Sequence, residues 1–443
     1  MSVAHLPPLG AGDAPGPRRS LLLAGGGIRV AYQAGVLLAL EEAGLRFHHA
    51  DGTSGGTFNL AMLMSGVAPT EVCARWRALR VRSFASLWPP RRLLAGPPYP
   101  ALGTADGIRR KVYPALGVDV ERIRAARGMD GTFNVCDFAA KACVAVPHTE
   151  ADLDVLTAGV SLPVVSPAVE RGGRTLVDAV WIKDTNVTEA LRRGAEELWL
   201  IWCIGNHGVY RDGALQQYVH MIEIAANGAL QEELALVRER GARLHVIRPR
   251  VPLPLDPDFF LGRVDASTLI AMGYRDAAAY LDAPHAEGVT PDASATRMED
   301  PVPGMACREQ FAGEGLEVRL GWEIDDLDAF VADPHGTLVG DVTHRALGVR
   351  RPARAGRFEV AAGEVTAELD VAGSRLQLRR RLRDGDHVDA QLDGVPVGRL
   401  RRTGPPAWRT LHARGVGSAR EGARAQLRFA RWLRTALNTR TPS

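Results

Sequence analysis

Two glycine-rich segments near the start of the chain contain the residue types that acyl transfer by a serine requires. The first is Gly25-Gly26-Gly27, and the second is Gly52-Thr53-Ser54-Gly55-Gly56, which has the G-x-S-x-G spacing of a nucleophile elbow. Glycines beside a serine permit the sharp turn that exposes its Oγ. Free backbone N–H groups of a glycine run can donate to the oxyanion of a tetrahedral intermediate. The two segments therefore predict a nucleophile and an oxyanion site.

The apolar pattern places both segments at strand-to-helix junctions. A buried strand is expected at 20–24, followed after the glycine run by a helix at 29–43. A second strand at 46–51 leads into the elbow, and a helix at 55–66 follows it. Ser54 and the glycine run are thus expected at the carboxyl ends of strands, where open α/β sheets bind ligands.

A glycine run after a strand can also bind the phosphates of a nucleotide. The segment Gly25-Gly26-Gly27-Ile28-Arg29 lacks the Lys-Ser/Thr of a P-loop, and it does not have G-x-G-x-x-G spacing. Nucleotide binding is therefore not expected, and no cofactor is predicted.

The start of the chain resembles the opening of the patatin-like phospholipases. The resemblance rests on this glycine segment, on a helix ending at 40–44 and on the elbow. Members of this family are acyl hydrolases with a Ser-Asp dyad and no histidine. The resemblance covers about residues 18–250 and implies a three-layer α/β fold with Ser54 as nucleophile. Arg29 is expected to brace the glycine loop, the alternative being a solvated arginine in the first helical turn. The oxyanion-hole donors are predicted among Gly25, Gly26, Gly27 and Ile28, and the elbow glycines are Gly52 and Gly56.

The family's third element is an Asp-Gly-Gly or Asp-Gly-Ala triplet after a strand, usually preceded by a hairpin and followed by an asparagine and an alanine-rich helix. Residues 166–180 have this layout, and Asn186 follows them. The resemblance therefore implies that Asp178 is the aspartate of the dyad. The chain departs from the family pattern at Ala179-Val180, which replace the small pair, and at Val30, where the family often has a glycine.

The chemistry also requires a base near Ser54. Asp178 ends an expected strand at 174–178, and adjacent parallel strands would bring the two strand ends together. Since the reference pKa of aspartate is about 3.9, burial among apolar neighbours must raise the pKa of Asp178 for it to act as a base. Asp184, in the same segment, is instead expected to form a surface ion pair or a turn cap.

A Ser-Asp-His triad of the α/β-hydrolase type is the alternative mechanism. Ser54, Asp178 and either His220 or His245 occur in the required chain order. However, His220 lies in a helical pattern and His245 inside an expected strand, whereas a triad histidine normally comes from a loop. The elbow also occurs earlier in the chain than that fold requires.

The rest of the chain is expected to form one α/β domain and one β domain. Apolar runs alternate with helical patterns up to about residue 250, which predicts a mainly parallel sheet covered on both faces. Beyond about residue 295, period-two alternation predicts a separate antiparallel β domain. The further strands are expected at 131–136, 141–146, 174–178, 197–204 and 243–248, and the further helices at 69–80, 105–116, 187–193 and 213–240. The expected division is a disordered tail at 1–17, the acyl hydrolase domain at 18–282, a linker at 283–304, and a β-rich accessory domain at 305–443 that ends in a basic amphipathic helix.

Composition excludes several other classes of function. The chain has 443 residues, 46% of them hydrophobic, and a net charge of +3, which favours neither nucleic acid nor an acidic partner. The five cysteines form no C-x-x-C pair, so neither a metal site nor a disulfide framework is expected. No run reaches the roughly 18 apolar residues of a membrane span. A cytoplasmic protein that can make peripheral contact with a membrane is predicted.

The predicted function is hydrolysis of carboxylic esters in phospholipids or acylglycerols. The alternative is a catalytically weak lipid-binding or scaffold protein with the same fold. Residues 76–99 mix aromatic side chains such as Trp88 with arginines such as Arg91 and Arg92, which favours a lid or lipid-docking loop. In the C-terminal helix, the apolar stripe that contains Phe429 and Trp432 is expected to pack on the protein's own core.

Overall fold

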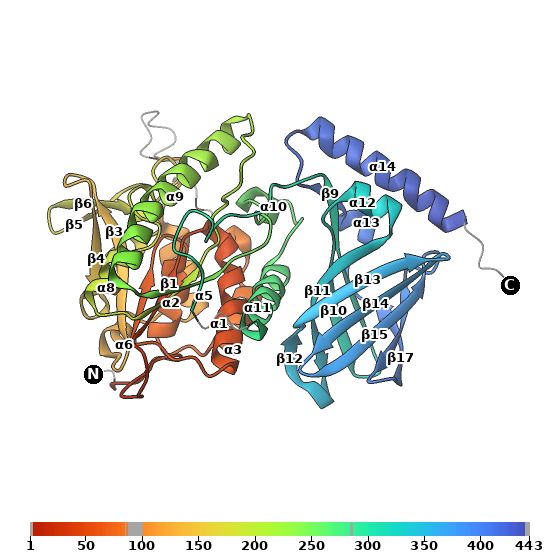
Figure 1. Cartoon of the computed structure of the whole chain (residues 1–443), viewed down its shortest axis with the longest axis horizontal. Coiled ribbons are helices and arrows are strands. Elements are labelled where there is room, and N and C mark those ends of the chain that lie inside the picture. Colours follow the sequence, from red (N-terminus) through yellow and green to blue (C-terminus); the bar gives the residue numbers. More distant parts are fainter. Residues whose placement is uncertain (1–2, 85, 87–100, 284–286, 439–443) are drawn as a thin grey trace. The chain divides into compact units, whose positions relative to one another are not determined.

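The computed structural model describes residues 3–84, 86, 101–283 and 287–438. The chain divides into two compact units. The first consists of residues 1–256 and 280–298, and the second of residues 257–279 and 299–443. Figure 1 labels their helices and strands.

The first unit is built on an eight-stranded sheet with the order β5-β6-β3-β2-β1-β7-β8, in which β4 also pairs with β3. The pairings among β3, β2, β1, β7 and β8 are parallel, whereas β3–β4, β3–β6 and β5–β6 are antiparallel. The sheet is therefore mainly parallel, with an antiparallel edge. The strands are β1 (Arg19–Leu23), β2 (His49–Gly52), β3 (Asp130–Asp137), β4 (Ala142–Pro147), β5 (Val169–Arg171), β6 (Arg174–Asp178), β7 (Glu197–Ile201) and β8 (Arg243–Ile247).

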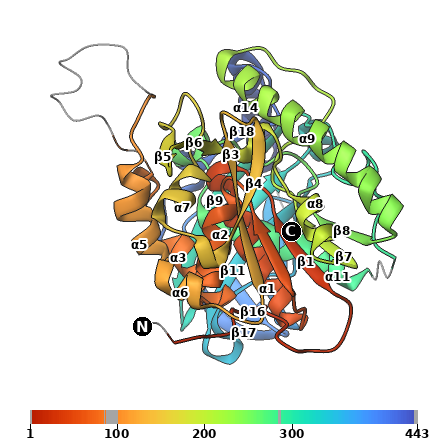
Figure 2. The same cartoon turned by 90° about the vertical axis from the view of Figure 1, so that its left-hand side faces the viewer.

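Helices cover both faces of this sheet, because consecutive side chains along its central strands point to opposite faces and are nearly all buried. Figure 2 shows α8 and α9 on one side of the strands and α2 and α3 on the other. Leu22 of β1 packs with Ala190 of α8 and Leu230 of α9, while Leu60 of α2 lies against Gly52 of β2. The helices are α1 (Ala31–Glu42), α2 (Gly56–Met64), α3 (Pro69–Ala78), α5 (Tyr113–Leu116), α6 (Val120–Ala125), α7 (Leu153–Ala158), α8 (Val187–Arg192) and α9 (Ala214–Arg240), with 3-10 turns at Gly27–Val30 and Ala179–Trp181.

The N-terminal segment differs from the expected disordered tail. Leu9 is buried, the amide of Ala11 donates to Phe47 O at 2.8 Å, and His5 forms a bridge with Ala126. Although the segment is rich in proline and glycine, Leu9 and Ala11 are buried and hold it on the rest of the first unit, whereas Val3 and Leu6 are exposed.

The division of the chain also differs from the expected boundaries at residues 282 and 304. Residues 257–279, which include most of α11 (Ala266–Asp282), group with the second unit. Within the expected linker, the amide of Val289 donates to Leu244 O at 2.7 Å, and Met298 is buried in the core of the first unit. These few apolar residues anchor a segment whose overall composition is polar.

The second unit is a closed antiparallel sheet. Its strands follow the order β10-β11-β13-β14-β15-β16-β17-β9, and β9 also pairs with β10, which closes the ring; β12 and β18 attach outside it. The elements are β9 (Gly304–Gly313), β10 (Leu316–Ile324), α12 (Leu327–Ala332), β11 (His335–His344), β12 (Gly348–Pro352), β13 (Ala355–Ala361), β14 (Glu364–Val371), β15 (Ser374–Arg381), β16 (His387–Leu392), β17 (Val395–Arg402), α13 (Ala407–Thr410), β18 (His412–Arg414) and α14 (Ala419–Asn438).

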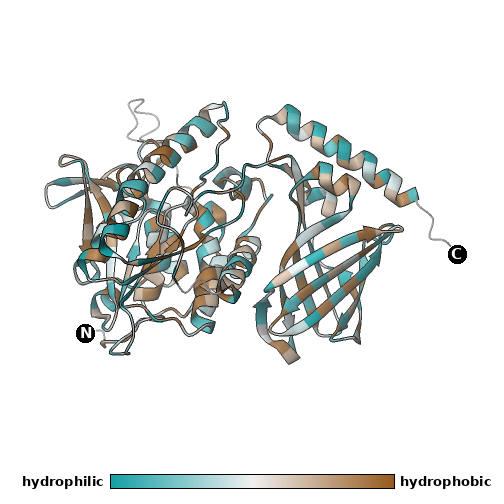
Figure 3. Cartoon of the chain, viewed as in Figure 1, coloured by the Kyte–Doolittle hydropathy of each residue, from teal (hydrophilic) through white to brown (hydrophobic). Residues whose placement is uncertain are grey.

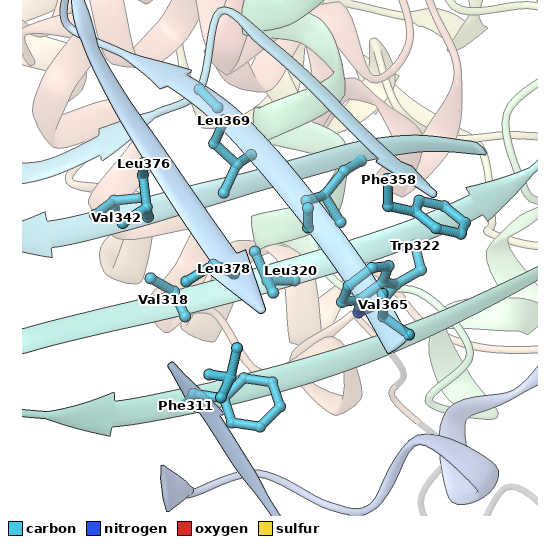
Figure 4. Packing of buried hydrophobic residues seen from close by; sticks show 14 of the residues in the cluster. Phe311, Val318, Leu320, Trp322, Val342, Phe358, Val365, Leu369, Leu376 and Leu378 are labelled. Atoms are coloured by element: carbon cyan, nitrogen blue, oxygen red, sulfur yellow. The ribbon is translucent and has the colours of Figure 1, made fainter. Parts of the chain in front are cut away.

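Apolar side chains fill the inside of the closed sheet. Figure 3 shows hydrophobic and hydrophilic residues alternating along its strands, and Figure 4 shows side chains such as Val318, Leu320, Leu376 and Leu378 packing together. The cavity recorded among them measures about 10 Å³. This cavity has room for about one water molecule, which is too little for an acyl chain.

Candidate active site

Ser54 occupies a strained turn between β2 and α2. Its backbone φ is +50°, a left-handed conformation that is uncommon for a residue with a side chain. Glycines surround it because nothing larger fits: a Cβ on Gly56 would lie 2.0 Å from Leu23 O, and one on Gly55 would lie 2.5 Å from Gly27 O. The elbow glycines thus let the turn pack directly against the glycine run.

The register of three strands brings Asp178 to the level of Ser54. Gly52, two residues before the serine, pairs with Phe133 of β3, and Val135, two residues farther along β3, pairs with Asp178. The expectation of adjacent parallel strands was wrong in this detail. β3 separates β2 from β6, and β6 runs antiparallel to β3, so β6 reaches the site from the opposite direction.

The carboxyl group of Asp178 is completely buried and only half satisfied by hydrogen bonds. Oδ1 accepts the N–H of Val180 at 2.9 Å, whereas Oδ2 has no hydrogen-bond partner among the described residues. Burial raises the pKa of Asp178 to about 7, while the Val180 N–H and the neighbouring Ser54 hydroxyl act in the opposite direction. Ser54 therefore lies close enough to influence the carboxyl group, although the geometry of the pair falls short of a formed hydrogen bond. Catalytic hydrogen bonds are often long or poorly aligned before substrate binds.

The glycine run presents two free amides. The Gly25 N–H donates to both carboxyl oxygens of Asp184 at 3.0 Å, and the Ile28 N–H donates to Oδ1 of Asp256 at 3.2 Å. The amides of Gly26 and Gly27 have no partner within the described part of the chain. Of the four amides expected as oxyanion donors, Gly26 and Gly27 are thus the two available in this structure.

Asp184 does not lie at the surface as expected. Its side chain is buried, and burial together with the charge of Asp178 raises the pKa of Asp184 well above its ordinary value. A Cβ on Gly25 would lie 2.4 Å from Oδ1 of Asp184 and 2.8 Å from Cβ of Ser54, so this carboxyl group holds the start of the glycine run beside the nucleophile. The polar neighbours of Asp184 in the sequence, Lys183 and Thr185, are typical of an exposed segment and gave no sign of this burial.

Asp256 is a further carboxyl group at the glycine run, and no sequence motif indicated it. Its Oδ2 lies 2.4 Å from the position that a Cβ on Gly27 would occupy. Burial raises the pKa of Asp256, and the positive charge of Arg29 together with the Ile28 N–H acts in the opposite direction. Arg29 also donates from Nε to Gly26 O at 2.9 Å, which is the bracing contact expected of it. Asp256 lies 228 residues from Ile28, so only the fold brings them together.

A buried polar network supports the elbow from the sheet side. Asp51 accepts hydrogen bonds from Thr132 Oγ1 at 3.0 Å, Asn134 Nδ2 at 2.7 Å and the Asn186 amide at 3.3 Å. Asn134 also donates to Thr53 Oγ1 at 2.9 Å, one residue before the nucleophile. Burial raises the pKa of Asp51 to about 7. Asn186, expected from the family pattern, is therefore a member of this network as well as the cap of α8.

The two histidines of the alternative triad are engaged elsewhere. His220 pairs with Glu223 through Nδ1 at 2.9 Å on α9. His245 lies in β8, where its Nδ1 contacts Tyr280 Oη at 3.0 Å and its ring stacks on Trp199 with centroids 4.2 Å apart. β8 is three strands away from β2 in the sheet. These contacts favour the dyad over the triad.

The segment expected to dock on lipid is only partly described. Trp76 is buried, donates from Nε1 to Asn59 Oδ1 at 2.8 Å and stacks on Phe84 with centroids 6.4 Å apart, so both aromatic residues belong to the packing around α2 and α3. Trp88, Arg91 and Arg92 lie outside the described residues. The beginning of the segment thus contributes these two aromatic residues to the packing, and a lid or lipid-docking role for the segment stays a prediction.

The second unit contains a cavity of about 190 Å³ that is separate from these residues. Its lining includes Asp265 and Arg308, which pair with each other, and Asp341, which pairs with Arg350. Its charged groups therefore have partners within the unit itself, and none of the residues predicted for catalysis lines it.

Comparison with known proteins finds one family whose model matches the first part of the chain. The model of the patatin-like phospholipase family matches residues 21–191, a range that contains the glycine run, Ser54 and Asp178. This part of the chain is therefore similar to the patatin-like phospholipases, a family whose membership implies lipid acyl hydrolase activity. Among solved structures the chain is similar to VipD from Legionella pneumophila, with 13% identity and a TM-score of 0.33 over 61% of this chain and 67% of that chain. No curated protein matches the sequence.

The described helices were also compared with the requirements for crossing a bilayer. None of them combines the length and the apolar character that a membrane-spanning helix needs.

Proposed function

We propose that the first unit hydrolyses carboxylic esters of phospholipids or acylglycerols through an acyl-enzyme on Ser54, with Asp178 as the base. One observation carries the proposal: a buried carboxyl group with an unpartnered oxygen lies beside a serine in a strained glycine turn. A buried acceptor without a partner is costly and therefore rare in folded proteins. Acceptance of the serine proton during catalysis would explain why Oδ2 of Asp178 is kept without a partner.

The reaction begins with attack of Ser54 Oγ on the ester carbonyl carbon. The serine proton passes to Oδ2 of Asp178, and the carbonyl oxygen becomes an oxyanion that accepts the N–H groups of Gly26 and Gly27. Collapse of this intermediate breaks the bond to the alcohol, which takes the proton from Asp178 as it leaves. A base with a pKa of about 7 suits both directions of proton transfer near neutral pH.

Water completes the cycle on the acyl-enzyme. Asp178 accepts a proton from the attacking water, and the same two amides stabilise the second oxyanion. When this intermediate collapses, the Ser54 oxygen leaves with the proton and the fatty acid is released. The buried network through Asn134 and Thr53 keeps the serine in place throughout.

The test is release of fatty acid from a panel of defined phospholipids, lysophospholipids and acylglycerols. Ser54→Ala and Asp178→Asn should each abolish release, and the double variant should be no worse than either, because the two residues act as one unit. His220→Ala and His245→Ala serve as controls that should retain activity. Loss of activity in a histidine variant together with an active Asp178→Asn variant would establish the triad instead. Lipid binding by the parent protein without measurable release from any substrate would favour the weakly catalytic lipid-binding protein.

A further inference from the structure

The C-terminal helix α14 has two faces with different roles. Its apolar face packs on the core of the second unit: Trp432 lies 4.6 Å from Phe330 between ring centroids, Phe429 lies 6.4 Å from Phe330, and Ala425 is buried. This confirms that the apolar stripe belongs to the protein's own core. Figures 1 and 3 show the helix along the surface of this unit. The opposite face has no such function in the fold.

That opposite face is a dense row of arginines. At 100° per residue, five exposed arginines fall within an arc of about 120° around the helix axis. They extend over about 21 Å along that axis. Leu427, which is 54% exposed, lies in the same arc. Five arginines and Glu421 give the helix a net charge of +4, whereas the whole chain carries +3, so the rest of the chain carries −1. We call this row, which consists of Arg420, Arg424, Arg428, Arg431 and Arg434, the arginine face.

The protein itself makes little use of the arginine face. The side chain of Arg428 pairs with Asp328, while the other four guanidinium groups have no hydrogen-bond or ion-pair partner among the described residues. Arginines four apart, such as Arg420 and Arg424, repel each other, and a cation in the first turn opposes the helix dipole. Apart from the Arg428–Asp328 pair, the row therefore lowers the stability of the helix without a compensating contact among the described residues.

We propose that the arginine face docks the protein on a membrane surface that contains anionic phospholipids. Guanidinium groups form paired hydrogen bonds with phosphate oxygens, and an exposed leucine among them can enter the head-group region. The choice of a lipid partner over a nucleic acid rests on the proposed function, because a lipid hydrolase must reach its substrate in a bilayer. The near-neutral remainder of the chain also argues against a general nucleic-acid surface.

The experiment is sedimentation of the full chain with vesicles of phosphatidylcholine alone or mixed with 30% phosphatidylglycerol. The variant Arg424→Gln/Arg431→Gln removes two unpaired charges and keeps good helix formers. Each basic residue at an anionic surface contributes about fivefold to binding, so the double variant should bind the mixed vesicles about 30-fold more weakly. The matched control, Arg345→Gln/Arg381→Gln, removes two exposed arginines elsewhere in the same unit and should bind like the parent.

Binding to the mixed vesicles but not to phosphatidylcholine alone, with the loss confined to Arg424→Gln/Arg431→Gln, supports the proposal. Equal binding by this variant and the parent overturns it, as does retention of a labelled DNA duplex or RNA by the parent without binding to either vesicle. Circular dichroism confirms that the helix is intact. Ser54→Ala should bind vesicles like the parent, and Arg424→Gln/Arg431→Gln should hydrolyse a monomeric ester normally. Failure of docking and failure of the catalytic proposal are therefore separate results.

Discussion

Replacement of Asp178 by asparagine should abolish turnover and at the same time stabilise the protein at alkaline pH. The pKa of Asp178 is about 7 in the folded protein, against an ordinary value of 3.8. Between these two values the unfolded chain loses this proton while the folded chain keeps it, so the stability of the parent falls as pH rises through that window. Above pH 7 the carboxyl group is ionised in both the folded and the unfolded state, and the full free-energy cost of burying its charge remains.

The size of the effect follows from this shift. Three pH units at 1.36 kcal/mol each give about 4 kcal/mol as an upper bound for the cost of ionising the buried carboxyl group. Asparagine has nearly the same shape and stays neutral. The stability difference between Asp178→Asn and the parent should therefore be under about 1 kcal/mol at pH 4 and rise towards about 4 kcal/mol at pH 8. Turnover by the parent should rise with pH through about 7, because the base must be ionised to accept the serine proton.

Denaturant unfolding of parent and variant at pH 4, 6 and 8 measures this difference, with the exposed Asp212→Asn as the matched control in the same unit. The control should show no comparable dependence on pH. An Asp178→Asn variant that is no more stable than the parent at pH 8 would refute the assignment of a desolvated, ionisable carboxyl group. So would a stability gain of the same size at pH 4 and pH 8.

Two further predictions concern the glycine run. Gly27→Ala should lower kcat about 100-fold with little change in KM, because its Cβ would lie 2.4 Å from the Asp256 carboxyl group and displace an oxyanion donor. The control is Gly44→Ala, since Gly44 also has a positive φ but a Cβ there would meet no atom within 4 Å, and this variant should keep its activity. Equal losses of activity in both variants would point to unfolding. Asp256→Ala should raise turnover at pH 8 about tenfold, because it removes a carboxylate from the oxyanion site and frees the Ile28 amide. A slower Asp256→Ala enzyme with unchanged stability would show that this carboxyl group helps catalysis instead.

The sequence was sufficient to predict the elements around Ser54 because their signals are local. Glycines that a turn requires, apolar runs that become buried strands, and the layout before Asp178 all lie within short windows of the chain. The strands expected at 20–24, 131–136 and 174–178 correspond closely to β1, β3 and β6.

What the sequence did not reveal depends on contacts between distant segments. The carboxyl groups of Asp184 and Asp256 approach the glycine run only because the folded sheet and the loop after β8 bring them there. The antiparallel direction of β6 is a choice of pairing that no local pattern encodes. The helix at 266–282 was missed although its apolar residues recur at helical spacing, whereas the anchored residues near Val289 lie in a segment whose average composition is that of a loop.

Active-site labelling with a fluorophosphonate tests the central claim most directly, since the probe reacts only with an activated serine. The parent protein should take up one phosphonyl group, and mass spectrometry of the digest should locate it on Ser54. Asp178→Asn should react far more slowly, Ser54→Ala should not react at all, and His245→Ala should react like the parent. Labelling of a different residue, or uptake by Ser54→Ala equal to that of the parent, would contradict the assignment of Ser54 as the nucleophile.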